Sequence, residues 1–180
     1  IDLNRDTLVD LVIGNRNGNF KYYENTGTST NPIFTKVADT LGHINTKRFN
    51  EFSGNATPLI VEESGNYILL SGSVNGYLYR FGNIDGNLTG TFSVMDSTYK
   101  NIWEGSQTTL AGADVNNDGD IDLLIGNYSG GIAYYQGEEP SSIQEIEVLS
   151  DIKVYPNPSK GVFQFDFGKN NLRNANTVSY

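Results

Sequence analysis

The sequence predicts an all-β protein built from a repeated unit, and three observations carry that prediction. The chain of 180 residues contains 20 Gly, 11 Tyr and 9 Phe, a mixture that suits short aromatic strands joined by tight turns. No segment shows the sustained 3.6-residue period of a surface helix. The chain also repeats its own sequence, which indicates several copies of one structural unit.

The repeat is clearest between residues 2–25 and residues 114–137. These segments align without a gap, with residue 2 on residue 114, and 11 of 24 positions are identical. A weaker third copy at residues 71–83 aligns with residues 13–25, so the three copies follow one another at similar intervals along the chain. The interval is longer than that of most solenoid repeats and suits a four-stranded β-propeller blade with long loops.

Each copy predicts the same succession of strands and turns. The apolar runs Val9–Asn15 and Ile121–Asn127 are typical of strands, and hairpin turn signals follow at residues 17–18, 75–76 and 130–131. An aromatic strand is expected after each turn, at Phe20–Tyr23, Tyr77–Phe81 and Ile132–Tyr135. Further strands are expected at Ile33–Ala38, Leu59–Glu62, Tyr67–Leu70, Thr91–Met95 and Thr108–Ala113.

The order of these strands predicts a partial β-propeller of about two and a half four-stranded blades in residues 1–137. One whole blade is expected at residues 55–100, and three strands of another at residues 105–137. The first blade is expected to lack its first strand. Because a propeller ring closes with four to eight blades, we expect the rest of the ring to lie upstream in a longer precursor, or the chain to pack in some other way.

A ladder of oxygen-bearing side chains opens the last repeat. Asp114, Asn116, Asp118 and Asp122 occupy positions 1, 3, 5 and 9 of a loop. Calcium takes six to eight oxygen ligands, and alternate residues of a tight loop can aim their oxygens at one point. The spacing predicts a Ca²⁺ site formed by these four side chains and the backbone carbonyl of Asp120.

This loop could also be an EF-hand, a magnesium site or a turn that binds no metal. An EF-hand needs a Glu at position 12 before a helix, whereas Ile125 stands there before a predicted strand. Magnesium demands a stricter octahedron, which disfavours it. An Asx-rich turn around Gly119 that binds no metal is the remaining alternative.

The N-terminal repeat carries a second ladder at the same spacing. The second candidate calcium loop consists of Asp2, Asn4, Asp6, Leu8 and Asp10. Thr7 replaces the turn glycine and Arg5 stands beside the ligands, so a degenerate loop without metal is the alternative here. The middle repeat offers only residues 62–66 at this place, which is too short to chelate, and no metal is expected there.

The ladder and the Leu-x-Ile-Gly-Asn strand after it resemble the FG-GAP or VCBS repeats of integrin-like propellers and many bacterial surface proteins. The resemblance covers about residues 2–137 and rests on the Asp/Asn spacing, while the Phe-Gly-Gly-Ala-Pro signature is absent. It implies that calcium loops stiffen one rim of a propeller and that ligands bind elsewhere.

The C-terminal part of the chain differs from the repeats in composition and pattern. A linker is expected at residues 138–150, followed by Val-Tyr-Pro-Asn-Pro at 154–158 and by a strand whose aromatic face is Phe163, Phe165 and Phe167. This run resembles the start of the C-terminal sorting domain of the type IX secretion system of Bacteroidota, over residues 151–180. The resemblance implies a small β-sandwich, the type IX secretion machinery as a partner, and a secreted or outer-membrane-surface location in a Gram-negative bacterium.

Composition narrows the classes of function. The absence of Cys excludes disulfides, thiol nucleophiles and thiolate metal sites. The net charge of -9 repels phosphate backbones and argues against a nucleic-acid partner. No apolar run approaches the roughly 20 residues of a membrane span.

The remaining residues favour a binding protein over an enzyme. His43 is the single histidine, and no hydrolase nucleophile motif is present. Trp103 and the tyrosine pairs at 22–23 and 134–135 could stack on sugars, although their strand positions favour the core. The expected function is a calcium-binding adhesion or binding module for an unknown extracellular protein or glycan. The alternative is a non-catalytic accessory region of a secreted hydrolase.

Overall fold

The protein is all-β, as the composition and patterning predicted. The computed structural model describes residues 1–138, 142–144, 153–155 and 164–166. Within these residues the chain forms strands and two short 3-10 helices, η1 (Leu41–His43) and η2 (Tyr99–Asn101), and no α-helix. None of these helices has the length and hydropathy of a membrane span.

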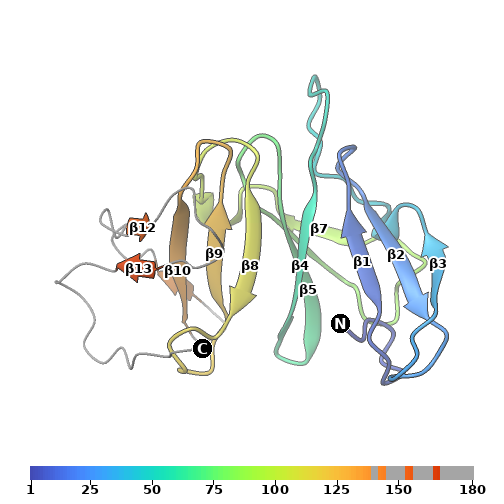
Figure 1. The fold of residues 1–180 in the computed structure, drawn as a ribbon. Helices are drawn as coiled ribbons and strands as arrows, with labels where there is room; N and C mark the ends of the chain where they lie inside the picture. Colours follow the sequence, from blue (N-terminus) through green and yellow to red (C-terminus); the bar gives the residue numbers. More distant parts are fainter. Residues whose placement is uncertain (139–141, 145–152, 156–163, 167–180) are drawn as a thin grey trace.

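Three antiparallel sheets contain most of the described chain (Figure 1). Sheet 1 has the order β1-β2-β3, with β1 (Leu11–Gly14), β2 (Phe20–Asn25) and β3 (Phe34–Ala38). Sheet 2 has the order β4-β5-β6-β7, with β4 (Thr57–Glu63), β5 (Asn66–Gly72), β6 (Tyr79–Gly82) and β7 (Ser93–Asp96). Sheet 3 has the order β8-β9-β10-β11, with β8 (Thr109–Ala113), β9 (Asp122–Gly126), β10 (Ile132–Glu138) and β11 (Ser142–Gln144).

The C-terminal tail contributes one further pair of described strands. Strands β12 (Lys153–Tyr155) and β13 (Gln164–Asp166) are antiparallel, and Val154 is paired with Phe165. The expected proline bend at 156–158, and the alternation that includes Phe163 and Phe167, lie outside the described residues. The expected linker at residues 138–150 contains strand β11, which pairs with β10 through Gly137 and Ile143.

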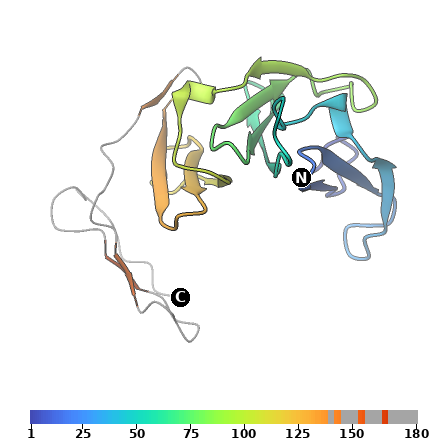
Figure 2. The same ribbon diagram turned by 90° about the horizontal axis from the view of Figure 1, so that it is seen from above.

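The three sheets lie side by side along an arc, which Figure 2 shows from above. One core cluster fills the space between sheets 1 and 2 and includes Phe20, Tyr22, Leu69 and Phe81. The second core cluster lies between sheets 2 and 3 and includes Leu70, Leu78, Leu123 and Ile125. Sheet 2 is therefore buried on both faces, whereas sheets 1 and 3 each bury one face.

The aromatic residues that could have stacked on sugars divide between core and surface. Tyr22 and Tyr135 are buried in the two cores, as their strand positions predicted, whereas Tyr23 and Tyr134 are half-buried. Trp103 contradicts that prediction, because its side chain is 57% exposed. Its ring nitrogen donates to the carbonyl of Asn75 at 3.0 Å, and its backbone forms an isolated β-bridge with Tyr77.

Candidate metal-binding loops

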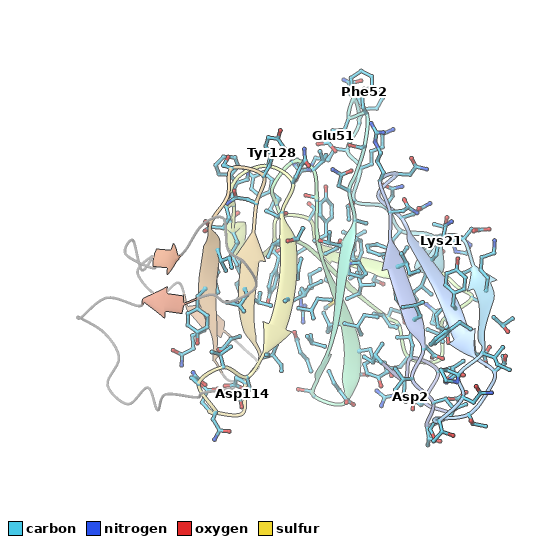
Figure 3. All side chains as sticks on the ribbon, viewed as in Figure 1. Asp2, Lys21, Glu51, Phe52, Asp114 and Tyr128 are labelled. Carbon is cyan, nitrogen blue, oxygen red and sulfur yellow. The ribbon has the colours of Figure 1, made fainter. Side chains whose placement is uncertain are left out.

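The two Asp/Asn ladders lie at the same edge of the row of sheets. Figure 3 labels Asp2 and Asp114 at this edge, and places Phe52 and Tyr128 at the opposite edge. One ladder joins β8 to β9, and the other runs directly into β1. Because the strands alternate in direction in the same order in each sheet, equivalent loops of the repeat emerge on the same side.

The loop at residues 114–122 is folded around its own side chains. The carboxylate of Asp114 accepts hydrogen bonds from the backbone N–H of Asp118 at 3.1 Å and of Gly119 at 3.0 Å. The Asn116 oxygen accepts from the same Asp118 N–H at 2.9 Å, and Asp118 accepts from the N–H of Asp120 at 2.9 Å. Side-chain oxygens from positions 1 and 3 thus meet at the backbone of position 5.

The N-terminal loop repeats this arrangement bond for bond at the equivalent positions of the repeat. Asp2 accepts from the N–H of Asp6 at 3.0 Å and of Thr7 at 2.8 Å. Asn4 accepts from the Asp6 N–H at 3.1 Å, and Asp6 accepts from the N–H of Leu8 at 2.8 Å. Replacement of the turn glycine has therefore not changed the loop geometry.

The φ angles show that both loops place residues other than glycine in the left-handed region, which such residues rarely adopt. Arg5 and Asn117 occupy the same place in the two loops, with φ of 60° and 61°. Gly119 has φ of 96° and its counterpart Thr7 has φ of 77°. A β-branched residue at positive φ is strained, so the hydrogen bonds to Asp2 must hold Thr7 there.

The side chains at position 9 are buried anchors. Asp122 accepts from the N–H of Val115 at 2.9 Å and of Gly137 at 2.8 Å, and Tyr134 also donates to it. This carboxylate therefore fastens the start of the loop to strand β10. Asp10 is fastened equivalently, and its donors are Leu3 N–H at 3.0 Å, Asn25 N–H at 2.9 Å and Tyr22 OH at 2.9 Å.

Asp10 and Asp122 were expected as ligands that close the sites, and in this structure each carboxylate also accepts hydrogen bonds from the fold around it. In the described part of the chain, no group of three or more His, Cys, Asp or Glu side chains is gathered so that it could hold a metal ion. In each ladder the carboxylate at position 9 is buried, whereas positions 1, 3 and 5 are exposed in the later loop and half-buried or exposed in the N-terminal loop. The reason is local, because Asp122 is already the first residue of strand β9.

Hydrogen bonding and burial around the loop shift the pKa values of Asp118 and Tyr134 in opposite directions. The backbone N–H of Asp120, followed by the Asn116 amide, lowers the pKa of Asp118, which therefore stays anionic. Burial, followed by the hydrogen bond to Asp122, raises the pKa of Tyr134, so this hydroxyl remains a proton donor. Burial and Asp10 raise the pKa of Tyr22 in the same way.

Arg5 links the N-terminal loop to sheet 2, a contact that the sequence did not reveal. Its guanidinium lies 2.7 Å from Asp85 and 3.3 Å from Glu62, and it covers the ring of Tyr67 at 4.1 Å. The partners are 57 and 80 residues away in sequence, so no local pattern points to them. The tight β4–β5 hairpin of the middle repeat is thus held by the neighbouring loop.

The opposite edge carries an aromatic finger that sequence reasoning also missed. The finger is residues 46–54, with Thr46 Oγ1 donating to the Gly54 carbonyl at 3.2 Å. Phe49 and Phe52 project from it and are 95% and 99% exposed. Arg48 fixes the finger by donating to Tyr79 Oη at 3.1 Å and to the Ser97 carbonyl at 3.2 Å. The sequence signal that could have indicated the finger is the pair Phe49 and Phe52 in a segment without strand periodicity.

Comparison with known proteins adds no family assignment. No protein-family model, curated protein or solved structure matches the chain.

Proposed function

We propose that this chain is a calcium-stiffened portion of an extracellular β-propeller, with calcium at one edge and ligand binding at the other. The observation that carries the proposal is the bond-for-bond identity of the two ladders, in the first and last repeats, at one edge of the row of sheets. A strained Thr7 in the N-terminal copy supports a shared role for this geometry.

The exposed parts of both loops suit calcium chemically. A carboxylate offers about four acceptor sites, so Asp114 and Asp118 keep lone pairs beyond those that accept N–H bonds. The salt bridges found within residues 1–137 include neither carboxylate. Calcium accepts six to eight oxygens, water included, and so does not need every ligand from the protein.

The proposed ligands are the residues at positions 1, 3, 5 and 7 of each ladder. In the later loop they are Asp114, Asn116, Asp118 and the carbonyl of Asp120. In the N-terminal loop they are Asp2, Asn4, Asp6 and the carbonyl of Leu8. Asp122 and Asp10 brace these loops from the core side. Bound calcium would supply charge compensation and rigidity at this edge.

Isosteric amide substitutions test this assignment. Asp118→Asn and Asp6→Asn keep an acceptor oxygen but remove one charge from each loop, so calcium affinity is expected to fall tenfold or more at the altered loop. Isothermal titration calorimetry measures that change. Asp39→Asn is the matched control, because Asp39 is exposed, pairs with Lys36 at 3.1 Å and lies outside both ladders. Equal losses in the control variant would refute a specific site.

The sheet arrangement supports the propeller part of the proposal. Sheets 2 and 3 are four-stranded antiparallel meanders, and sheet 1 is a three-stranded one. They follow one another in chain order along an arc (Figure 2). Successive meanders arranged radially are the construction of a propeller.

The aromatic finger supports ligand binding at the edge away from the calcium loops. Exposed Phe49 and Phe52 are held out on a backbone that Arg48 fixes, so little ordering is required on binding. Trp103 and Tyr128 are exposed as well. Rigid aromatic side chains at a loop edge are suited to contact a protein or a glycan.

Export by the type IX secretion system is proposed for the tail on the basis of its sequence motif. The pairing of β12 with β13 supports it, since it places Val154 opposite Phe165, one residue from each part of the motif. A soluble reporter fused to residues 151–180 should appear outside the cell in a Bacteroidota host with a working secretion system. Retention of that reporter in the periplasm would contradict the proposal, provided that a complete sorting domain exports the same reporter.

A further inference from the structure

The aromatic finger lies in the connection from sheet 1 to sheet 2, and the connection from sheet 2 to sheet 3 is its repeat counterpart. Both connections end against the hairpin turn of the sheet that follows them. Val74 N–H donates to the Gly54 carbonyl at 2.8 Å at the end of the first connection. Tyr128 N–H, from the equivalent turn of sheet 3, donates to the Ser106 carbonyl at 2.9 Å. Gly54 and Ser106 are therefore equivalent positions.

The two connections begin in the same way but differ in length. Asn45 Oδ1 lies 2.4 Å from the place that a Cβ on Gly18 would take. Trp103 Nε1 lies 2.6 Å from the equivalent place on Gly76. Eight residues then lead from Asn45 to Gly54, whereas two lead from Trp103 to the equivalent serine. The finger is therefore an insertion that the joining of two sheets does not require, and insertions in repeat proteins often form the binding face.

The finger has a buried base and a protruding apolar tip. Thr46 at the base is 0% exposed, whereas Phe49 and Phe52 are 95% and 99% exposed. The N–H of Glu51 donates to the Arg48 carbonyl at 3.2 Å and closes the turn at the tip. Figure 3 labels Phe52 at the outermost point of this edge. Phenylalanine rings carry no donor or acceptor for the hydroxyls of a glycan, and a protruding tip is not the concave site that a small molecule needs.

Positive charge lies directly behind this tip. Arg16 is exposed at the base of the finger, where its carbonyl accepts the N–H of Gly54 at 2.9 Å. Lys47 is exposed on the finger itself, and within the described residues neither side chain forms a salt bridge. The acid of the finger, Glu51, accepts the backbone N–H of Arg48 at 2.7 Å. The cations are therefore available to an anionic partner.

The net charge of -9 conceals a separation of charge between the two edges of the row. The two ladders at residues 2–10 and 114–122 hold seven aspartates and one arginine. The loops at the finger edge, residues 15–19, 45–55, 73–77, 103–107 and 127–131, hold three cations and two acids. Because salt screens charge beyond a Debye length of about 8 Å, the local charge of the approaching edge decides the contact. An anionic surface therefore favours the finger edge and repels the ladder edge.

We propose that the finger inserts Phe49 and Phe52 into the interface of an anionic lipid bilayer, where Arg16 and Lys47 contact the headgroup phosphates. The order of side chains outward from the sheets matches the order of the layers in such an interface. Tyr128 is 75% exposed nearer the sheets, the cations follow at the base of the finger, and the apolar rings lie outermost. Tyrosine is enriched where membrane meets water, and lysine and arginine favour the headgroup level.

A lipid surface fits this tip better than a protein or a further sheet. A specific protein interface buries roughly 1,200–2,000 Å² over complementary surfaces, whereas the finger offers two rings on a narrow loop. A bilayer needs no complementary pocket. Sheets stack through their faces, as the two cores show, whereas the finger leaves the row at an edge (Figure 1). The inference goes beyond the proposed function, because the calcium loops bind calcium whether or not the finger contacts lipid.

Sedimentation with phospholipid vesicles tests the contact. The chain is expected to bind vesicles of phosphatidylcholine with about one third phosphatidylglycerol, and to bind pure phosphatidylcholine more weakly. Phe49→Ser combined with Phe52→Ser should weaken binding roughly tenfold or more, because both apolar rings are lost. Lys47→Gln should weaken it about fivefold at low salt, the contribution of one cation near an anionic surface.

Phe34→Ser is the matched control, and it should bind vesicles like the parent chain. Phe34 is an exposed phenylalanine on strand β3, and it pairs with Asn25, whose N–H donates to Asp10 at the ladder edge. Circular dichroism and calcium titration of each variant show whether the fold and the calcium loops are intact. Both should be unchanged in the finger variants, since Phe49 and Phe52 are exposed.

An indole at the tip reports insertion directly. Phe52→Trp in a Trp103→Phe background places the chain's single tryptophan on the finger. Its emission should shift to the blue when the anionic vesicles are added, and brominated lipid should quench it. Emission that does not change on vesicle binding would contradict insertion. A parent chain that does not bind vesicles would overturn the proposal and leave a protein as the occupant of the tip, and equal binding by the double serine variant would overturn it as well.

Discussion

Replacing Asp122 with Ala is expected to lower the free energy of unfolding by about 4 kcal/mol. The side chain is buried, and two backbone N–H groups, of Val115 and Gly137, lose their acceptor in the variant. The Gly137 donor is buried and the Val115 donor is part-buried. A buried donor left without a partner costs roughly 1–3 kcal/mol, and Tyr134 loses its acceptor as well. Urea denaturation measures the loss.

The same measurement in excess chelator separates the two roles that Asp122 could have. If Asp122 is a buried anchor, its removal lowers the free energy of unfolding by the same amount with and without calcium. If Asp122 is a calcium ligand, its removal lowers the free energy of unfolding only when calcium is present. Asp39→Ala is the control, since it removes an exposed carboxylate and should change stability by less than about 1 kcal/mol. A loss confined to calcium-containing buffer would support Asp122 as a ligand and contradict its role as an anchor.

Gly72→Ala is expected to lower the free energy of unfolding by about 3 kcal/mol. The new Cβ would lie 2.1 Å from the carbonyl oxygen of Thr108, and a backbone atom can move only if sheets 2 and 3 shift apart. Overpacking of this kind typically costs about 1–3 kcal/mol, and this contact is with backbone on both sides. Thermal unfolding followed by circular dichroism gives the change.

Gly126→Ala is the matched substitution at the equivalent position of sheet 3. Its Cβ would meet only the Thr109 side-chain oxygen at 3.3 Å, so the change in the isolated chain should be small. If Gly72→Ala is as harmless as Gly126→Ala, the close packing of sheets 2 and 3 at this glycine is wrong.

Sequence repetition made most of the strands predictable. Thr108–Ala113 was expected as a strand and β8 covers Thr109–Ala113. The expected start at Tyr77 was wrong, since β6 begins at Tyr79 and Tyr77 pairs only with Trp103. Strand β11 was missed because residues 142–144 are too short to show a period.

The candidate site was predictable in its spacing and not in its burial. Spacing placed Asp114, Asn116 and Asp118 in one loop, because alternate residues of a tight turn share a side. The burial of Asp122 depends on Val115 and Gly137, and Gly137 is brought there only when β10 pairs with β9. Such contacts arise from tertiary pairing, so local sequence patterns carry little trace of them.

Equilibrium dialysis against labelled calcium tests the central claim most directly. The account predicts two calcium ions per chain, one in each ladder, with one ion lost in Asp118→Asn and the other in Asp6→Asn. Saturation at 100 times the dissociation constant should stabilise the fold by about 2.7 kcal/mol for each site. A parent chain that retains no calcium above the dialysis buffer would contradict the account.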